Sequence, residues 1–166
     1  MLPWQELLTD TVIMIVIFTA FVLGSVFWKP RIWLHDFPAD IQAMAPPKTA
    51  EEKRITRWFG LAFGIIFFGL PLVLGWDLKT LMGSDYSFAN AWLYGYVIFF
   101  AVNLWDLIVL DWIGFSLTDP NNPPIPGTEG AAGYRNYMFH FVGFLKGCVM
   151  GIVFALVFAA IITLLA

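Results

Sequence analysis

The sequence predicts an all-α fold: a polytopic membrane protein that forms a bundle of four transmembrane helices. Hydrophobic residues make up 60% of the 166 residues and charged residues only 13%, which is about half the charged fraction of a soluble domain. Four apolar runs each approach or exceed the roughly 20 residues that a helix needs to cross the hydrocarbon core. None of the runs alternates polar and apolar residues as the strands of a membrane β-barrel do.

We expect a single transmembrane domain over residues 1–166. Its first apolar run lacks the basic flank of a signal peptide and is too long for the apolar region of one, so we expect it to be retained as a spanning helix. The connections 29–55 and 114–136 are predicted to be ordered. The four helices are predicted at 8–28, 56–76, 89–113 and 137–165.

The connections and the second helix carry their own signals. Thr49 followed by Glu52 is typical of a helix N-cap and first turn, so the second helix is expected to begin ahead of its apolar run. Pro71 is expected to kink this helix near its end. The apolar segment 32–38 is expected to lie along the membrane surface or to cap the bundle. The Pro-rich segment 118–127 is expected to form extended turns.

The distribution of basic residues predicts the orientation of the helices. Short loops rich in Lys and Arg stay on the cytoplasmic side of a membrane. The connection 77–88 holds only Lys79, whereas the first connection holds Lys29, Arg31, Lys48, Lys53, Arg54 and Arg57. We therefore expect the first and third connections in the cytoplasm and both termini outside.

The third and fourth helices carry ionisable residues within their apolar runs. A charge at the bilayer centre costs about 2.5–3.5 kcal/mol on insertion scales, so such residues are candidates for a functional site. In an antiparallel hairpin, Asp106 and Lys146 fall at one depth, and we expect them to form an ion pair. The predicted polar intramembrane site consists of Asn103, Asp106, Asp111, His140 and Lys146.

The role of this site is left open by the sequence. The Asp106–Lys146 pair can act as a staple that fixes helix register, as a proton or ion relay, or as part of a binding site. On ideal α-helices Asp106 and Asp111 lie about 140° apart. Asp111 and His140 are therefore expected to turn to one flank of the hairpin, towards Arg135 or the first connection.

We expect His140 to be an interfacial histidine that is bonded to Asp111 or to a backbone carbonyl. His35, the only other histidine, lies in the first connection. A haem or metal site formed by His35 and His140 is the weaker alternative. No ligand spacing supports such a site, and we predict no cofactor.

Small residues recur four apart, a spacing that lets helix backbones approach closely in a membrane. We expect them to pack within the bundle, with a contact between two copies as the alternative. They are Gly60 and Gly64 in the second helix and Gly143, Gly147, Gly151, Ala155 and Ala159 in the fourth.

Three segments resemble a group of small four-helix bacterial integral membrane proteins. The segments are NLWDLIVLDW at 103–112, IPGTEG at 125–130 and FHFVGFLKG at 139–147. The resemblance implies a bacterial source and a multi-pass protein of the plasma (inner) membrane. It brings no activity, cofactor or catalytic residue.

These observations predict a small oligomeric protein of the channel or transporter kind, with its polar site open to the cytoplasm. The alternative is a structural or regulatory subunit that binds a partner protein. A haem or metal protein or an enzyme ranks lowest, since the sequence lacks the common hydrolase and phosphate-binding motifs. We expect contacts with membrane lipid and with a second copy or a partner membrane protein. Nucleic acid is not an expected partner, because twelve Asp and Glu outnumber nine Lys and Arg.

Overall fold

The computed structural model describes residues 2–119 and 121–166, and all regular structure in these ranges is helical. Pro120, which belongs to the predicted Pro-rich connection, lies outside the described residues. The prediction of four helices that are long and apolar enough to cross a membrane is confirmed. They are α1 (Trp4–Trp28), α3 (Ala50–Leu74), α5 (Phe88–Trp105) with its continuation η3 (Asp106–Phe115), and α6 (Tyr137–Leu165).

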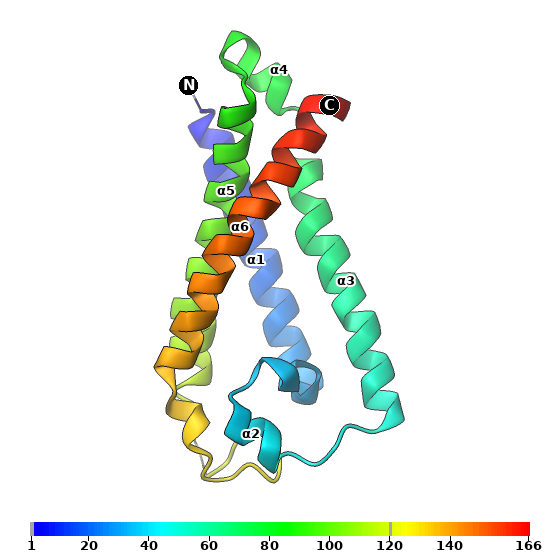
Figure 1. The fold of residues 1–166 in the computed structure, drawn as a ribbon, viewed down its shortest axis with the longest axis vertical. Coiled ribbons are helices and arrows are strands. Elements are labelled where there is room, and N and C mark those ends of the chain that lie inside the picture. The colour runs from blue at the N-terminus through cyan, green and yellow to red at the C-terminus, as the bar shows by residue number, and fades with distance from the viewer. Residues whose placement is uncertain (1, 120) are drawn as a thin grey trace.

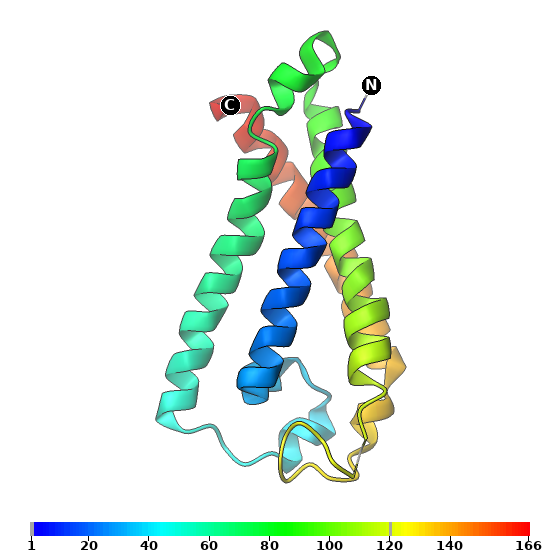
Figure 2. The ribbon, with the colours of Figure 1, turned by 180° about the vertical axis from the view of Figure 1, so that it is seen from behind.

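The two ends of the bundle differ in what they hold. Both chain termini lie at one end, the terminal end, together with α4 (Leu78–Met82) (Figure 1). The opposite end, the loop end, holds the two long connections with η1 (Pro30–Asp36), α2 (Ala39–Met44) and η4 (Ala132–Arg135) (Figures 1 and 2). The predicted grouping of these two connections at one end is therefore confirmed, and the side of the membrane that they occupy stays a prediction.

The start of α3 is fixed by the capping motif that the sequence contains. Thr49 Oγ1 accepts a hydrogen bond from the Glu52 backbone N–H at 3.2 Å, and Glu52 Oε2 accepts one from the Thr49 N–H at 2.7 Å. This reciprocal pair satisfies two amides that a helix start leaves free. Arg31 Nε also donates to Glu52 Oε1 at 2.6 Å, which ties the first connection to α3.

The outward faces of the long helices are apolar and uncovered. Val12 of α1, Ile65 of α3 and Val149 of α6 are exposed by 58%, 73% and 64%. A soluble monomer rarely exposes a contiguous apolar patch larger than a few hundred Å², so apolar faces of this length are unusual for one. A lipid environment removes this penalty, so the exposed faces agree with a membrane-spanning bundle.

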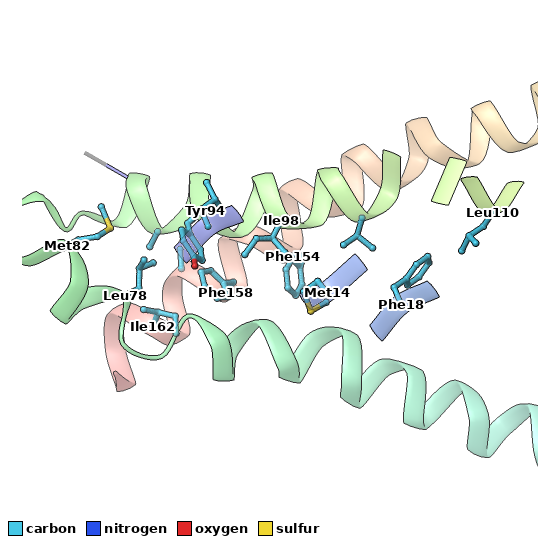
Figure 3. Close-up of a cluster of buried hydrophobic side chains, with 14 residues drawn as sticks. Met14, Phe18, Leu78, Met82, Tyr94, Ile98, Leu110, Phe154, Phe158 and Ile162 are labelled. Atoms are coloured by element: carbon cyan, nitrogen blue, oxygen red, sulfur yellow. The ribbon is translucent and has the colours of Figure 1, made fainter. Parts of the chain in front are cut away.

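The main core runs along the inside of the bundle from α4 to η3, as Figure 3 shows. At its centre the rings of Tyr94 and Phe158 stack with centroids 6.3 Å apart. Gly95 makes room for this contact, because a Cβ there would lie 2.7 Å from Phe158 Cδ1. α5 and α6 therefore pack closely near the terminal end.

α3 and α6 meet only towards the terminal end. There the rings of Phe68 and Phe154 lie 5.4 Å apart, and a Cβ on Gly75 would come 2.6 Å from Phe158 Cζ. Towards the loop end the two helices diverge, as both views show (Figures 1 and 2). On the other side, α3 stays packed on α1 through aromatic pairs such as Phe21–Phe59, with centroids 4.4 Å apart.

The two connections at the loop end fold against each other and form a cap. Their side chains build a second, smaller core that consists of Leu34, Phe37, Ile41, Ile125, Ala131 and Tyr134. The Gly133 N–H donates to Asp40 Oδ2 at 2.7 Å, and the hydroxyls of Thr128 and Tyr134 are 2.8 Å apart. The prediction that these connections are ordered is confirmed for their described residues.

The small-residue stripe serves only in part to pack the helices. Gly147 and Gly151 face α5, and a Cβ at Gly151 would lie 2.6 Å from Phe99 Cδ1. At Gly60, Gly64 and Gly143 an added Cβ would meet nothing within 4 Å. The prediction that these three pack within the bundle is wrong, because α3 and α6 have already diverged where they lie.

We expect Gly151→Ala to lower the free energy of unfolding by about 1–3 kcal/mol, because the added methyl group overpacks the α5–α6 interface. Gly143→Ala on the same helix is the matched control. Its methyl group meets open space, and Ala is the better helix former by about 1 kcal/mol. Reversible unfolding in detergent micelles measures both, and equal losses in the two variants would contradict this packing.

Candidate functional site

α5 changes its helical geometry where the polar residues begin. Residues Asp106–Phe115 form a π-helix, and the Ser116 N–H still donates to the Asp111 carbonyl, five residues back, at 2.8 Å. In such a ladder the hydrogen bonds run from i to i+5, so residues five apart lie above one another. Asp106 and Asp111 therefore share one face, whereas an ideal α-helix would separate them by about 140°.

That shared face lines a cavity of about 1360 Å³ towards the loop end. All five residues of the predicted polar site line it: Asn103, Asp106, Asp111, His140 and Lys146. Its walls come from α1, α3, η3 and α6, and its cap side includes His35 and Asp36 of η1. Aromatic and aliphatic side chains such as Phe59 and Leu107 make up most of the remaining lining.

Asp111 and His140 form the firmest polar contact of the cavity. His140 Nδ1 lies 3.0 Å from Asp111 Oδ1, as expected for an interfacial histidine bonded to this carboxylate. His140 is 7% exposed and packs edge-on against the rings of Phe115 and Phe139. Its other nitrogen, Nε2, is buried without a hydrogen-bond partner among the described residues.

Asn103 holds α5 to α6. Its Nδ2 donates to the Phe144 carbonyl at 3.0 Å and to Cys148 Sγ at 3.6 Å. The Asn103 side chain also fills the space over Gly147, where an added Cβ would overlap it. A side-chain amide that bonds a neighbouring helix is a common device for joining helices in membranes.

The predicted Asp106–Lys146 ion pair is wrong. Within the described chain no nitrogen of Lys146 lies within 4.0 Å of an Asp106 oxygen, and neither side chain has a hydrogen-bond or ion-pair partner. Asn103 occupies the interface between the helices at this depth, which leaves Asp106 half-buried on the cavity wall and Lys146 exposed. The two opposite charges thus line one cavity and stay apart.

The cap contributes a third carboxylate. Asp36 Oδ2 lies 3.1 Å from His35 Nε2 at the edge of the cavity. Partial burial raises the pKa of Asp36, although His35 and Lys48 favour its charged form and Asp111 adds repulsion. We expected Asp111 to face Arg135 or the first connection, and the first connection does line the cavity beside it. Arg135 instead donates to the Ser116 carbonyl at the end of η3.

The structure gives the two histidines different surroundings. His35 is exposed in the cap and His140 is buried beside Asp111, and both line the cavity. No group of three or more His, Cys, Asp or Glu side chains within the described ranges is arranged to hold a metal ion.

A second buried carboxylate was missed by the sequence analysis. Asp10 of α1 is 8% exposed, and the Tyr94 hydroxyl donates to Asp10 Oδ2 at 2.5 Å near the terminal end. The signal was present, because Asp10 is an acidic residue within the first apolar run. This pair lies outside the large cavity and joins α1 to α5.

Comparison with models of known protein families, with curated proteins and with solved structures finds no match to this chain. The assignment of a function therefore depends on the geometry of the cavity.

We expect a double-mutant cycle to separate the two pairs. Asp111→Ala and His140→Ala should show a coupling free energy of about 0.5–3 kcal/mol, as contacting residues do. Asp106→Asn and Lys146→Met should couple more weakly than this pair, because no nitrogen of Lys146 lies within 4.0 Å of an Asp106 oxygen. Unfolding in micelles gives both values, and strong coupling between Asp106 and Lys146 would contradict the structure.

Proposed function

We propose that this protein is a transporter-like membrane protein that binds a charged solute in the cavity at its loop end. One observation carries the proposal: the ionisable residues of η3, α6 and the cap line a single cavity of about 1360 Å³. Ionisable residues that face a cavity inside a membrane protein typically mark the pathway of a substrate or ion.

The alternative role of a structural staple fits the cavity less well. A staple requires its two charges to neutralise each other, because a buried charge that lacks its partner strongly destabilises the fold. Asp106 and Lys146 line the same space without meeting, and only Asp111 and His140 are joined. A charge that is left unpaired in a cavity is available to a solute, which supports binding.

A structural or regulatory subunit is the second candidate, and the cap favours it. The two connections build their own hydrophobic core and are joined by the Gly133–Asp40 hydrogen bond. A rigid surface of this kind suits contact with a partner protein. Under this proposal the cavity would bind no charged ligand and would be closed to water.

The setting follows from the distribution of charge and from the resemblance described above. The loop end carries most of the basic residues, which supports a cytoplasmic cap and outside termini. We place the protein in a bacterial plasma membrane as an oligomer. Gly64 of α3 is uncovered and lies outside the cavity lining, so it offers close approach to a second copy.

We expect water to reach the cavity, which substituted cysteines can report. Cys148 is the only cysteine, so Cys148→Ser gives a background that keeps an acceptor for Asn103. In that background Gly143→Cys lines the cavity and Gly64→Cys does not, and neither position has an atom within 4 Å of the new Cβ. The membrane-impermeant cation MTS-ethyltrimethylammonium should label Gly143→Cys at least about tenfold faster, since thiolates form in water and not in lipid.

The two positions are also matched in their spacing from an aromatic residue of the same helix. Each lies six residues along its helix from an aromatic residue, Trp58 or Tyr137, which is about 9 Å of helix rise. Labelling at equally slow rates would mean that the cavity is dry. The solute-binding proposal would then be abandoned in favour of the structural subunit.

A further inference from the structure

The ionisable side chains of the cavity differ in whether another side chain contacts them. Asp111 is engaged by His140 at 3.0 Å and Asp36 by His35 at 3.1 Å. Asp106 and Lys146 line the same cavity, and each lacks an ion-pair partner within the described chain. The cavity therefore holds one carboxyl and one ammonium group that no side chain of the described residues contacts, beside two carboxyl groups that histidines contact.

Two walls of the cavity come from helices that diverge. Its α3 wall (Thr56, Phe59, Gly60 and Phe63) and its α6 wall (residues from Met138 to Lys146) belong to the two helices that diverge towards the loop end. On the α1 side α3 is sealed by aromatic contacts such as Phe18–Phe63, with centroids 6.3 Å apart. An added Cβ at Gly60 or at Gly143, one on each of these walls, would meet nothing within 4 Å. The cavity therefore has open space between α3 and α6, and its lining there is largely apolar.

We propose that the ligand is a zwitterionic phospholipid, which rests on the proposed function of the cavity as a binding site. Its ammonium group binds Asp106, its phosphate binds Lys146, and its acyl chains leave the cavity between α3 and α6. In such a lipid the phosphate is nearer the acyl chains than the ammonium group is. Lys146 is the more exposed of the two side chains and Asp106 the more buried, which suits a lipid whose chains stay outside the cavity.

The two uncontacted groups, Asp106 and Lys146, favour a zwitterion over a simple ion. A cation would neutralise Asp106 and leave Lys146 unpaired, and an anion would do the reverse. Each unpaired charge at this depth is unfavourable, and a ligand that carries both signs relieves both. The aromatic rings of the lining (Phe59, Phe139 and Phe144 among them) add faces that can attract an ammonium group.

Four lipids with identical dioleoyl chains test the proposal by native mass spectrometry of the full chain in a neutral detergent. The headgroups are phosphatidylethanolamine and phosphatidylcholine as zwitterions, phosphatidylglycerol as the anion and trimethylammonium-propane as the cation. We expect both zwitterions to bind about tenfold more tightly than the two singly charged lipids, a difference of about 1.4 kcal/mol. Equal affinities for all four lipids would overturn the proposal.

Two variants should change the order of preference. Asp106→Asn leaves Lys146 and should move the preference towards the anionic lipid, and Lys146→Met should move it towards the cationic lipid. Lys146→Arg keeps the charge and should keep the preference for zwitterions, which controls for a folding defect. Asp77→Asn removes an exposed carboxylate at the terminal end and should change nothing. An unchanged order in both cavity variants would place the lipid site elsewhere.

The soluble headgroup glycerophosphoethanolamine, a phosphodiester like the lipid, distinguishes a lipid from a free zwitterion. We expect millimolar glycerophosphoethanolamine to compete weakly, because it lacks the acyl chains that fill the apolar opening. Displacement of the lipid by an equal concentration of glycerophosphoethanolamine would assign the cavity to a soluble zwitterion and overturn the lipid proposal. Fast labelling of Gly143→Cys combined with no zwitterion preference would keep the solute-binding function and reject only this ligand class.

Discussion

The change from α-helix to π-helix at Asp106 is the feature on which the arrangement of the site depends. A regular α-helix would carry Asp111 away from the face of Asp106. The i to i+5 ladder brings both carboxylates onto one wall of the cavity, and it leaves Asp111 facing His140 at 3.0 Å. π-helical segments are frequent at functional sites, because the wider turn is less stable than an α-helix and persists where it positions side chains. In this protein the π-helix places two carboxylates, which an α-helix would point in different directions, on one polar surface.

The cap and the membrane helices act on this surface together. Phe115, at the end of η3, contacts the rings of Phe37 and Tyr134 in the cap and the imidazole of His140 in α6. A movement of the cap would therefore be felt at the Asp111–His140 contact. Because buried side chains pack closely and shift as units, this aromatic cluster couples the two connections to the polar wall. The packing of the cap also explains why segment 32–38 is more apolar than a simple linker.

The architecture could be predicted from the sequence to a large extent, and the site only in part. The four spans, the Thr49–Glu52 cap and the Asp111–His140 contact follow from apolar length, local capping chemistry and equal depth in a hairpin. The prediction of an Asp106–Lys146 ion pair was wrong because the sequence gives only the depth of each residue along its helix. The direction in which each side chain points also depends on the local helix geometry, and no residue pattern predicted the π-helix. Asn103 lies in the α5–α6 interface because Gly147 leaves room for its side chain. This contact depends on how the surfaces of the two helices fit together. Asp10 was overlooked although its position in an apolar run was a visible signal.

The contrast between the two ends of the bundle bears on how a ligand reaches the cavity. At the terminal end, Lys79 donates to the Thr163 carbonyl at 2.7 Å, the Tyr86 and Thr163 hydroxyls are 2.7 Å apart, and Tyr94 is bonded to Asp10. A water-soluble solute that crossed the membrane would have to break this sealed region, where polar groups are already satisfied and their loss is costly. A lipid headgroup avoids that barrier, because it can enter from the side where α3 and α6 diverge. The sealed end and the open side therefore both favour a ligand that comes from the bilayer.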